Sequence, residues 1–434
     1  MGHIVAKQTY KRLRERLDRY PVGTPGEGTI YEILKIIYTP EEAELAARMP
    51  LKFSSLGSLS RRLDIPRDEL RTKLDAMAAK GVVFDLHVKG KDRYILNPSM
   101  VGFIEFSMMR IREDIDQHKL GKLFHQYMLE EPDFANQFKE GTQTTPFRVL
   151  AHEETLPENY TEVLDWERAT HIVREAGRWA VGICYCRHVA HHMGNDCKAF
   201  PMESTCLSIG GGVDYLVRHG MAKEIERSEA EDLLNRSREA GLVHLCDNLK
   251  NKPTFICNCC GCCCEVLQGF KRFRTFGHTI SSNYEAAVDS TTCIGCKKCK
   301  KACPIDAVDV VEKPHMVGKK RFKRMARIDH DICLGCGVCA LVCKSGAMQM
   351  APRPRRRIAP ESTFARILMM AIEQDKLHEL LIDKDDGLTA LAANTLLGAV
   401  LKLPPAKQLL ARDALKSRFV DLLLSRLKKK PAGS

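Results

Sequence analysis

Hydrophobic positions in the first hundred residues change from a helical period to a strand period. IYEILKIIY (Ile30–Tyr38) and EEAELAARM (Glu41–Met49) repeat every three to four residues, which predicts two helices. LGSLSRRLDIPRDELRTKLDAMAAKG predicts a helix, a tight turn and a second helix ending at Gly81. VVFDLHVKGKDRYILN then alternates as two strands around the turn Lys89–Asp92. This order predicts a small mixed domain over residues 1–100.

The order of these elements resembles the winged-helix domains of many bacterial regulators, over Leu56–Asn97. The resemblance implies DNA binding. The second helix, Arg67–Lys80, has four basic and three acidic residues, whereas a recognition helix normally brings more positive charge to the phosphate backbone. We therefore expect this winged-helix-like unit to bind protein rather than DNA.

Helical periodicity predicts two further regions. Residues 101–180, for instance FIEFSMMRIREDI, are expected to form a helical connector, and residues 353–434 a helical segment. The C-terminal helices are TFARILMMAIEQ, LTALAANTLLGAVLKL and AKQLLARDALKSRFVDLLLSRLKKK. The longest apolar run, Ala390–Leu401, is shorter than the roughly 18 residues of a membrane span, so we expect no transmembrane insertion. The N-terminus has no apolar export signal, so the expected location is cytoplasmic.

Cysteine content changes the picture from a general mixed protein to a metalloprotein. The 434 residues, 44% of them hydrophobic, suffice for several domains with buried cores. The chain has 19 cysteines, which disulfides explain poorly in a reducing compartment. Thiolates bind soft metals and clusters. Metal or cluster ligation is therefore the leading interpretation.

The most specific motif occurs twice. TTCIGCKKCKKACPIDAV and DICLGCGVCALVCKSGAM both have the spacing C-x2-C-x2-C-x3-C. This spacing lets a short loop wrap one face of a 4Fe-4S cubane, while the fourth cysteine points toward a second cluster. Zinc knuckles are the alternative, but zinc sites usually pair two C-x2-C units across a longer gap. The repeat therefore favours iron–sulfur clusters.

The repeat resembles bacterial-type ferredoxin domains that hold two 4Fe-4S clusters, over residues 285–352. The resemblance implies two ligand sets: Cys293, Cys296, Cys299 and Cys343 for one cluster, and Cys333, Cys336, Cys339 and Cys303 for the other. Lys344 stands where the family has a proline, and a basic segment, GKKRFKRMAR, lies between the motifs. Both departures leave the implied ligands intact.

Positive charge is concentrated beside this repeat. Residues 293–358 hold 16 Lys and Arg against 5 Asp and Glu, nearly all of the chain's net charge of +12. The charge could compensate negative clusters and raise their reduction potentials. It could instead bind an acidic protein surface, or simply form a solvated face.

A second group of cysteines lies in residues 181–284. ICNCCGCCC (Ile256–Cys264) contains six, and Cys257, Cys260 and Cys263 repeat the C-x2-C-x2-C spacing. We expect one or two further iron–sulfur clusters here, with zinc or metal-free redox thiols as alternatives. The candidate ligands are Cys257, Cys260, Cys263, Cys184, Cys186, Cys197 and Cys206. Adjacent cysteines cannot all reach one cubane, so Cys259, Cys262 and Cys264 serve another cluster or are spare.

The expected fold is α+β and multidomain. Its five regions are a winged-helix-like unit (1–100), a helical connector (101–180), a cysteine-rich cluster domain (181–284), a bacterial-type ferredoxin domain (285–352) and a helical C-terminal segment (353–434). No Walker A motif or Rossmann fingerprint is present, and no catalytic residue is assigned. Electrons are therefore expected to come from and go to other proteins.

These observations predict a multi-cluster electron-transfer protein, more a subunit of an anaerobic cytosolic oxidoreductase than a complete enzyme. Its order of regions is similar to that of ferredoxin-domain proteins of anaerobic bacteria. Expected partners are other redox subunits, including an acidic or flavin-containing donor or acceptor. Two alternatives remain: an iron–sulfur oxidoreductase with its own substrate site in the cysteine-rich domain, and a redox-responsive winged-helix regulator.

Overall fold

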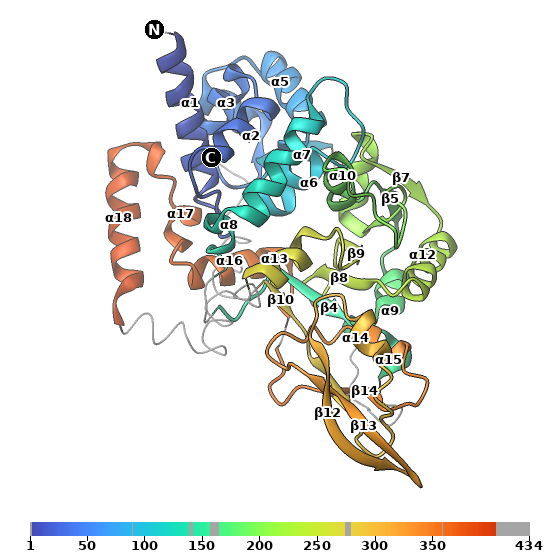
Figure 1. Ribbon diagram of the computed structural model, residues 1–434. Helices are drawn as coiled ribbons and strands as arrows, with labels where there is room; N and C mark the ends of the chain where they lie inside the picture. Colours follow the sequence, from blue (N-terminus) through green and yellow to red (C-terminus); the bar gives the residue numbers. More distant parts are fainter. Residues whose placement is uncertain are drawn as a thin grey trace. The chain divides into compact units, whose positions relative to one another are not determined.

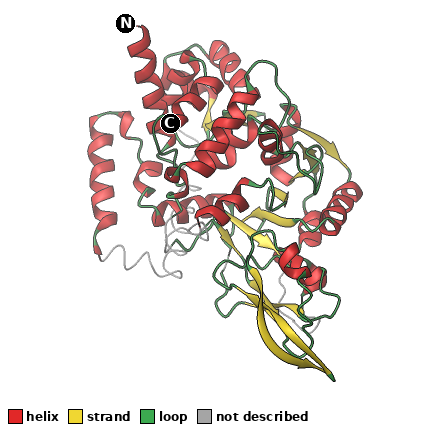
Figure 2. Cartoon of the chain, in the orientation of Figure 1, coloured by secondary structure: helices red, strands yellow, loops and turns green. Residues whose placement is uncertain are grey.

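The computed structural model describes residues 2–88, 90–138, 142–156, 165–273, 279–357 and 359–404 (Figure 1). These residues form two compact units, one from residues up to 107, 142–144 and from 360 onward, the other from 108–138 and 145–359. Helices and strands occur in both, in agreement with the α+β fold class (Figure 2). The five-region division is finer than these two units and stays a prediction.

The first unit begins with helices and a small antiparallel sheet. Its elements in chain order are α1 (Gly2–Leu17), α2 (Thr29–Ile37), α3 (Pro40–Arg48), β1 (Ser54–Ser55), α4 (Leu56–Leu63), α5 (Arg67–Ala79), β2 (Val83–Val88), β3 (Lys91–Leu96) and the single turn α6 (Ile104–Phe106). The strand order is β1-β3-β2. Ser55 caps α4, and Asp64 ends it in the left-handed conformation. The predicted helix, turn, helix and two strands are confirmed, with Lys89 outside the described residues.

The same unit contains the C-terminal helices α16 (Thr363–Glu373), α17 (Leu377–Leu381) and α18 (Leu388–Lys402). Asp383, in the turn before α18, accepts hydrogen bonds from Arg16 and Arg62. These contacts tie the two ends of the described chain into one unit. The predicted helix over AKQLLARDALKSRFVDLLLSRLKKK lies outside the described residues. No helix in the described ranges is both long and apolar enough to cross a bilayer.

A seven-stranded sheet organises the second unit. Its strands are β4 (Phe147–Leu150), β5 (Trp179–Gly182), β6 (Cys206–Ile209), β7 (Ala222–Ile225), β8 (Val243–Asp247), β9 (Phe255–Cys259) and β10 (Ile280–Ser281). They lie in the order β10-β4-β8-β9-β6-β5-β7, and only the β10–β4 pair is parallel. Its helices are α7 (Gln117–His125), α8 (Pro132–Ala135), α9 (Ala169–Glu175), α10 (Tyr185–His192), α11 (Val213–Arg218), α12 (Arg227–Glu239) and α13 (Glu265–Phe273).

One face of this sheet carries the main apolar core of the second unit. Ile172 of α9 and Leu233 of α12 pack in one buried cluster with Leu207, Cys246 and Ile256 of three neighbouring strands. Because alternate residues of a strand point to opposite faces, the neighbours of these strand residues point to the other face. That second face therefore receives Cys206 and both cysteines of β9.

The helical prediction for FIEFSMMRIREDI, residues 103–115, is wrong over most of its length. Only Ile104–Phe106 is α-helical. Beyond it, Gln117 accepts a hydrogen bond from the Arg112 backbone N–H, and Asp114 binds the Arg112 guanidinium, so side chains replace helical hydrogen bonds. Residues 101–180 also contain β4, whose four residues are all buried and therefore show no alternation.

The ferredoxin-like segment forms two antiparallel pairs and two short helices. Strand β11 (Tyr284–Val288) pairs with β14 (Met348–Pro352), and β12 (Val308–Val317) pairs with β13 (Lys320–Ile328). The latter pair is the long orange ribbon of Figure 1. Each cysteine motif runs into one of the helices, α14 (Lys298–Ala302) and α15 (Val338–Leu341).

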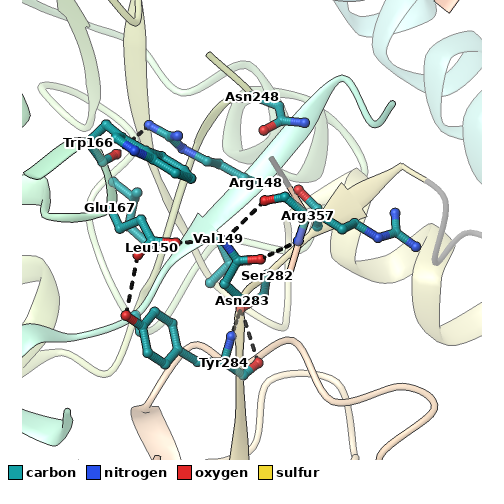
Figure 3. A pocket seen from close by; sticks show the side chains of 12 residues that line it. Arg148, Val149, Leu150, Trp166, Glu167, Asn248, Ser282, Asn283, Tyr284 and Arg357 are labelled. Atoms are coloured by element: carbon teal, nitrogen blue, oxygen red, sulfur yellow. Dashed lines mark hydrogen bonds between the residues drawn. The ribbon is translucent and has the colours of Figure 1, made fainter. Parts of the chain in front are cut away.

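A polar pocket marks the place where this segment leaves the sheet (Figure 3). Asn283 donates a hydrogen bond to Glu167 at 2.6 Å and accepts one from the Arg357 backbone N–H at 2.8 Å. The Arg148 guanidinium lies 4.8 Å from the centre of the Trp166 ring. The hydrogen bonds of Asn283 tie the two ends of the ferredoxin-like segment to each other and to Glu167.

Candidate cluster and metal sites

Four thiols of the ferredoxin-like segment line a first cavity: Cys293, Cys296, Cys299 and Cys343. The first three come from one motif and the fourth from the other. Gly295, at φ 63°, brings the loop directly against the Arg324 carbonyl of β13, where a β-carbon would clash. Glycine is therefore required for the loop to curl around the cavity.

The second cavity has the reciprocal composition: Cys333, Cys336, Cys339 and Cys303 line it. Gly335, at φ 67°, approaches the Tyr284 carbonyl too closely for any side chain. The structure thus brings each motif's last cysteine to the other motif's cavity. This is the grouping that the ferredoxin resemblance implies, although cluster ligation itself stays a proposal.

Backbone N–H groups point at several of these sulfurs. Cys303 accepts from Ala307 at 3.2 Å, Cys343 from Met348 at 3.3 Å and Cys333 from Ala286 at 3.5 Å. Such bonds favour the thiolate and tune a cluster bound to it. Burial acts in the opposite direction and raises the pKa of Cys336 to about 12. Bound iron ions would offset the cost of burying charged thiolates. The eight cysteines of the two cavities therefore fit as ligands of two 4Fe-4S clusters.

The cysteines of ICNCCGCCC are divided by the end of a strand. Cys257 and Cys259 lie on β9, while residues 261–263 form a turn beyond it. Cys257 pairs with Leu245 across the sheet, and Ile256, which points the other way, belongs to the apolar core. The two strand cysteines therefore face the sheet side opposite this core.

The first group, here called the six-thiol group, gathers cysteines from four parts of the sequence. Its members are Cys184, Cys186, Cys206, Cys257, Cys259 and Cys264. Cys257 interacts with Cys206 and Cys259, which in turn interacts with Cys264. Cys186 interacts with Cys264 and with Cys184. The six thiols thus influence one another's ionisation in a continuous series.

The second group, here called the four-thiol group, consists of Cys197, Cys260, Cys262 and Cys263. All four sulfurs lie within 4.8 Å of one another. Cys197 Sγ lies 3.5 Å from Cys260 Sγ and 3.7 Å from Cys262 Sγ, and Cys262 Sγ lies 3.5 Å from Cys263 Sγ. The group is thus compact enough to surround a single ion.

The seven ligands predicted for the cysteine-rich region do not come together in one place. Cys184, Cys186, Cys206 and Cys257 belong to the six-thiol group, whereas Cys197, Cys260 and Cys263 belong to the four-thiol group. Cys259, Cys262 and Cys264, expected to serve another cluster or to be spare, complete the two groups. The strand-like alternation of FICNC was the signal that could have separated Cys257 from Cys260.

Arg187 lies close to both groups and is buried. Its Nε donates to Cys197 Sγ at 3.3 Å and one Nη donates to the Asn258 carbonyl at 3.0 Å. Burial lowers the pKa of Arg187, but attraction to the thiolates of Cys184 and Cys260 outweighs burial, so the net shift is upward. A permanently charged guanidinium therefore stabilises thiolates in both groups.

The ionisation of neighbouring thiols is strongly unequal. Hydrogen bonding from Cys263, helped by attraction to Arg187, lowers the pKa of Cys260 to about 5. Burial raises the pKa of Cys262 to about 11. In the six-thiol group, hydrogen bonds from Cys206 and Cys259 lower the pKa of Cys257. Each group therefore contains at least one thiol whose lowered pKa favours the thiolate, the form that binds a metal.

The turn that carries the four-thiol group also touches the ferredoxin-like segment. A β-carbon on Gly261 would lie 2.5 Å from the Pro304 carbonyl oxygen. Pro304 lines the second cavity and follows Cys303 in sequence. Lys271 of α13 forms an ion pair with Asp306 at 2.9 Å in the same area. The cysteine-rich turn and the second cavity are therefore neighbours.

Comparison with known proteins defines one part of the chain. Residues 286–350 match the family described as the 4Fe-4S dicluster domain. No curated protein matches the chain. No solved structure matches it either. Residues 286–350 are therefore a ferredoxin-like iron–sulfur segment within a longer chain.

Proposed function

We propose that this protein is a multi-cluster iron–sulfur electron-transfer subunit of a larger anaerobic cytosolic oxidoreductase. The observation that carries the proposal is the pair of four-thiol cavities in residues 286–350, each completed by a cysteine of the other motif. The 4Fe-4S clusters that such cavities hold take up and release single electrons. The chain's own residues supply ligands, exclude water and guide partners.

Apolar packing connects the two cavities. Cys299, Cys339, Ala286 and Met348 belong to one buried cluster that borders both cavities. Low local polarity strengthens the electrostatic effect of nearby N–H groups and charges on a bound group. Short separation and exclusion of water are the two conditions that a protein supplies for electron transfer.

Exposed basic residues on β12, β13 and the turn between them, here called the basic ribbon, support the binding of an acidic partner beside the first cavity. Val310 of β12 and Ala326 of β13 line that cavity. On the same two strands and their turn, the exposed basic residues are Lys313, Lys319, Lys320, Arg321, Lys323, Arg324 and Arg327. Such a surface attracts a negatively charged protein and accelerates encounter. An acidic, flavin-containing donor or acceptor would therefore bind here.

The six-thiol group is the proposed location of a further iron–sulfur cluster. It holds four of the seven predicted additional ligands and contains more thiols than one ion can use. Gly261, in the turn just before Cys264, contacts Pro304 at the second cavity. The proposed path therefore runs from the basic ribbon through the two cavities toward the cysteine-rich region.

The N-terminal part is proposed to be a winged-helix-like domain that binds protein rather than DNA. The strand order β1-β3-β2 and the helix pair α4 and α5 support this fold. Three basic residues in or just after α5 are neutralised by carboxylates: Arg71 by Asp92, Lys73 by Glu69 and Lys80 by Glu42. These pairs lower the positive charge that α5 could offer to a phosphate backbone. Salt-dependent retention on duplex DNA would contradict this assignment.

The first test is the iron and acid-labile sulfide content of protein purified without oxygen, with EPR of the reduced sample. We expect about twelve irons per chain, of which about eight belong to the ferredoxin-like segment. The Cys296→Ser variant should alter the signals of one ferredoxin-type cluster. Cys246→Ser is the matched control, because Cys246 is a buried thiol outside both groups. Fewer than about eight irons in the wild type would contradict the proposal.

A further inference from the structure

We propose that the four-thiol group is a mononuclear metal site, in which four thiolates hold one divalent Zn²⁺ or Fe²⁺ ion. The site is distinct from every iron–sulfur cluster proposed above, and it does not depend on the electron-transfer function. Its ligands are Cys197, Cys260, Cys262 and Cys263. Three geometric and electrostatic observations carry this inference.

Sulfur separations fit a single ion. Tetrahedral coordination with metal–sulfur bonds of about 2.3 Å separates the ligand sulfurs by about 3.8 Å. The three close separations in the group are 3.5, 3.7 and 3.5 Å, and none exceeds 4.8 Å. A cubane binds its thiolates through four different irons and keeps them farther apart. The sulfurs of this group lie within 4.8 Å of one another, closer than the thiolates around a cubane.

The positive charge of Arg187 also supports a single metal ion held by four thiolates. Four thiolates around a divalent ion carry two net negative charges, and Arg187 donates directly to one of these thiolates, Cys197. Among the described residues, Arg187 forms no ion pair with a carboxylate, and one of its Nη atoms is buried without a hydrogen-bond partner. A buried cation needs negative charge beside it, and a metal–tetrathiolate centre supplies two net negative charges.

The connectivity indicates a structural role for the ion. Cys197 lies in the irregular stretch between α10 and β6, and the other three ligands lie at the end of β9 and in the turn before α13. Four protein ligands leave no open position for substrate, as in structural zinc sites. The ion would therefore link the stretch that contains Cys197 to the turn that contains the other three ligands. That turn positions Gly261 against Pro304 of the ferredoxin-like segment.

Metal analysis of the full-length protein tests the site. The wild type should contain about one zinc per chain, and zinc-edge X-ray absorption should show four sulfurs at about 2.3 Å. Cys262→Ser should remove that zinc and leave iron and sulfide unchanged. Cys262 is exposed, so its replacement should be compatible with folding. The matched control is Cys259→Ser, which changes a neighbouring thiol of the six-thiol group and should keep the zinc.

The measurement separates the two candidate ions and can overturn the site. If the occupant is iron, Cys262→Ser should release one iron and no sulfide. Loss of about four irons together with about four sulfides would identify a cluster and refute the inference. Zinc with nitrogen or oxygen neighbours, or wild-type protein with neither zinc nor a sulfide-free iron, would refute it as well. These results are independent of the iron count in the ferredoxin-like segment.

Discussion

The ferredoxin-like segment and the cysteine-rich region use the same cysteine spacing with different results. In the first, C-x2-C-x2-C lies on a loop that curls around a cavity, and Cys293, Cys296 and Cys299 stay together. In the second, the spacing begins on strand β9, and Cys257 is separated from Cys260 and Cys263. A spacing therefore specifies a cluster only when the backbone between the cysteines can curl.

The two regions also differ in how sulfurs are arranged. In the ferredoxin-like segment, four thiols line each cavity, with N–H groups directed at some of the sulfurs. In the four-thiol group the sulfurs touch one another, and a buried arginine supplies positive charge. The first arrangement suits a redox cluster and the second a single ion.

Removing a shared ligand should have the largest effect. Cys303 belongs to the first motif but lines the cavity of the second. We expect Cys303→Ser and Cys336→Ser to remove the same cluster, about four irons, and Cys296→Ser to affect the other. Iron analysis and EPR of the reduced variants check this. If Cys303→Ser instead matched Cys296→Ser, the exchange of ligands between the motifs would be wrong.

Acid should weaken the joint between the sheet and the ferredoxin-like segment. Burial lowers the pKa of His152 to about 4, and its backbone N–H donates to the Cys336 carbonyl. Since the folded pKa lies below the unfolded value near 6.5, the unfolded state binds more protons, and stability falls as the pH drops from about 6.5 toward about 4. The expected loss is about 2 kcal/mol by about pH 5.

Thermal unfolding against pH measures this effect. In His152→Gln the amide can still donate to the Leu242 carbonyl, which His152 Nε2 reaches at 2.9 Å, but it cannot titrate. The melting temperature of this variant should therefore depend less on pH. His171→Gln, on α9, serves as a control for the replacement of a histidine elsewhere in the same unit. An unchanged slope in His152→Gln would show that another group dominates, for instance His244, whose pKa burial lowers to about 3.

Adding one methyl group at Gly261 should disturb the contact between the cysteine-rich turn and the ferredoxin-like segment. A β-carbon at Gly261 would lie 2.5 Å from the Pro304 carbonyl oxygen, so Gly261→Ala should cost about 1–3 kcal/mol. The matched control is Gly211→Ala, where nothing lies within 4 Å, and its effect should stay within about 0.5 kcal/mol. Melting temperatures compare the two. Equal melting temperatures for the two variants would mean that the turn does not pack tightly against the ferredoxin-like segment.

Neutralising the basic ribbon should have the smallest effect. Replacing Lys320, Arg321 and Lys323 by Gln should slow reduction by an acidic flavoprotein by about tenfold at low ionic strength, and little at about 1 M salt. Stopped-flow kinetics measure the rate. The control replaces three exposed lysines elsewhere, Lys198, Lys223 and Lys252. If the control slowed equally, overall charge rather than the ribbon would guide the partner.

Prediction from sequence worked well where chemistry is local. The ferredoxin-like motifs pointed to the right segment, and the grouping implied for their eight cysteines is the one that the two cavities have. The helix pair and strands of residues 56–97 also followed from periodicity and capping residues. Periodicity failed in residues 103–115, where the polar side chains of Asp114 and Gln117 bind the chain around Arg112.

The amino-acid sequence specifies which residue types are available and which of them share a loop. Covalent geometry is sufficient there, because cysteines two residues apart on a curled loop cannot move far from one another. The division of the other cysteines into groups depends on the tertiary structure. Cys184, Cys206 and Cys264 meet because β9 lies beside β6, and β6 beside β5. Strand order depends on packing across the whole sheet, and the alternation of each strand then sets the face on which a thiol lies.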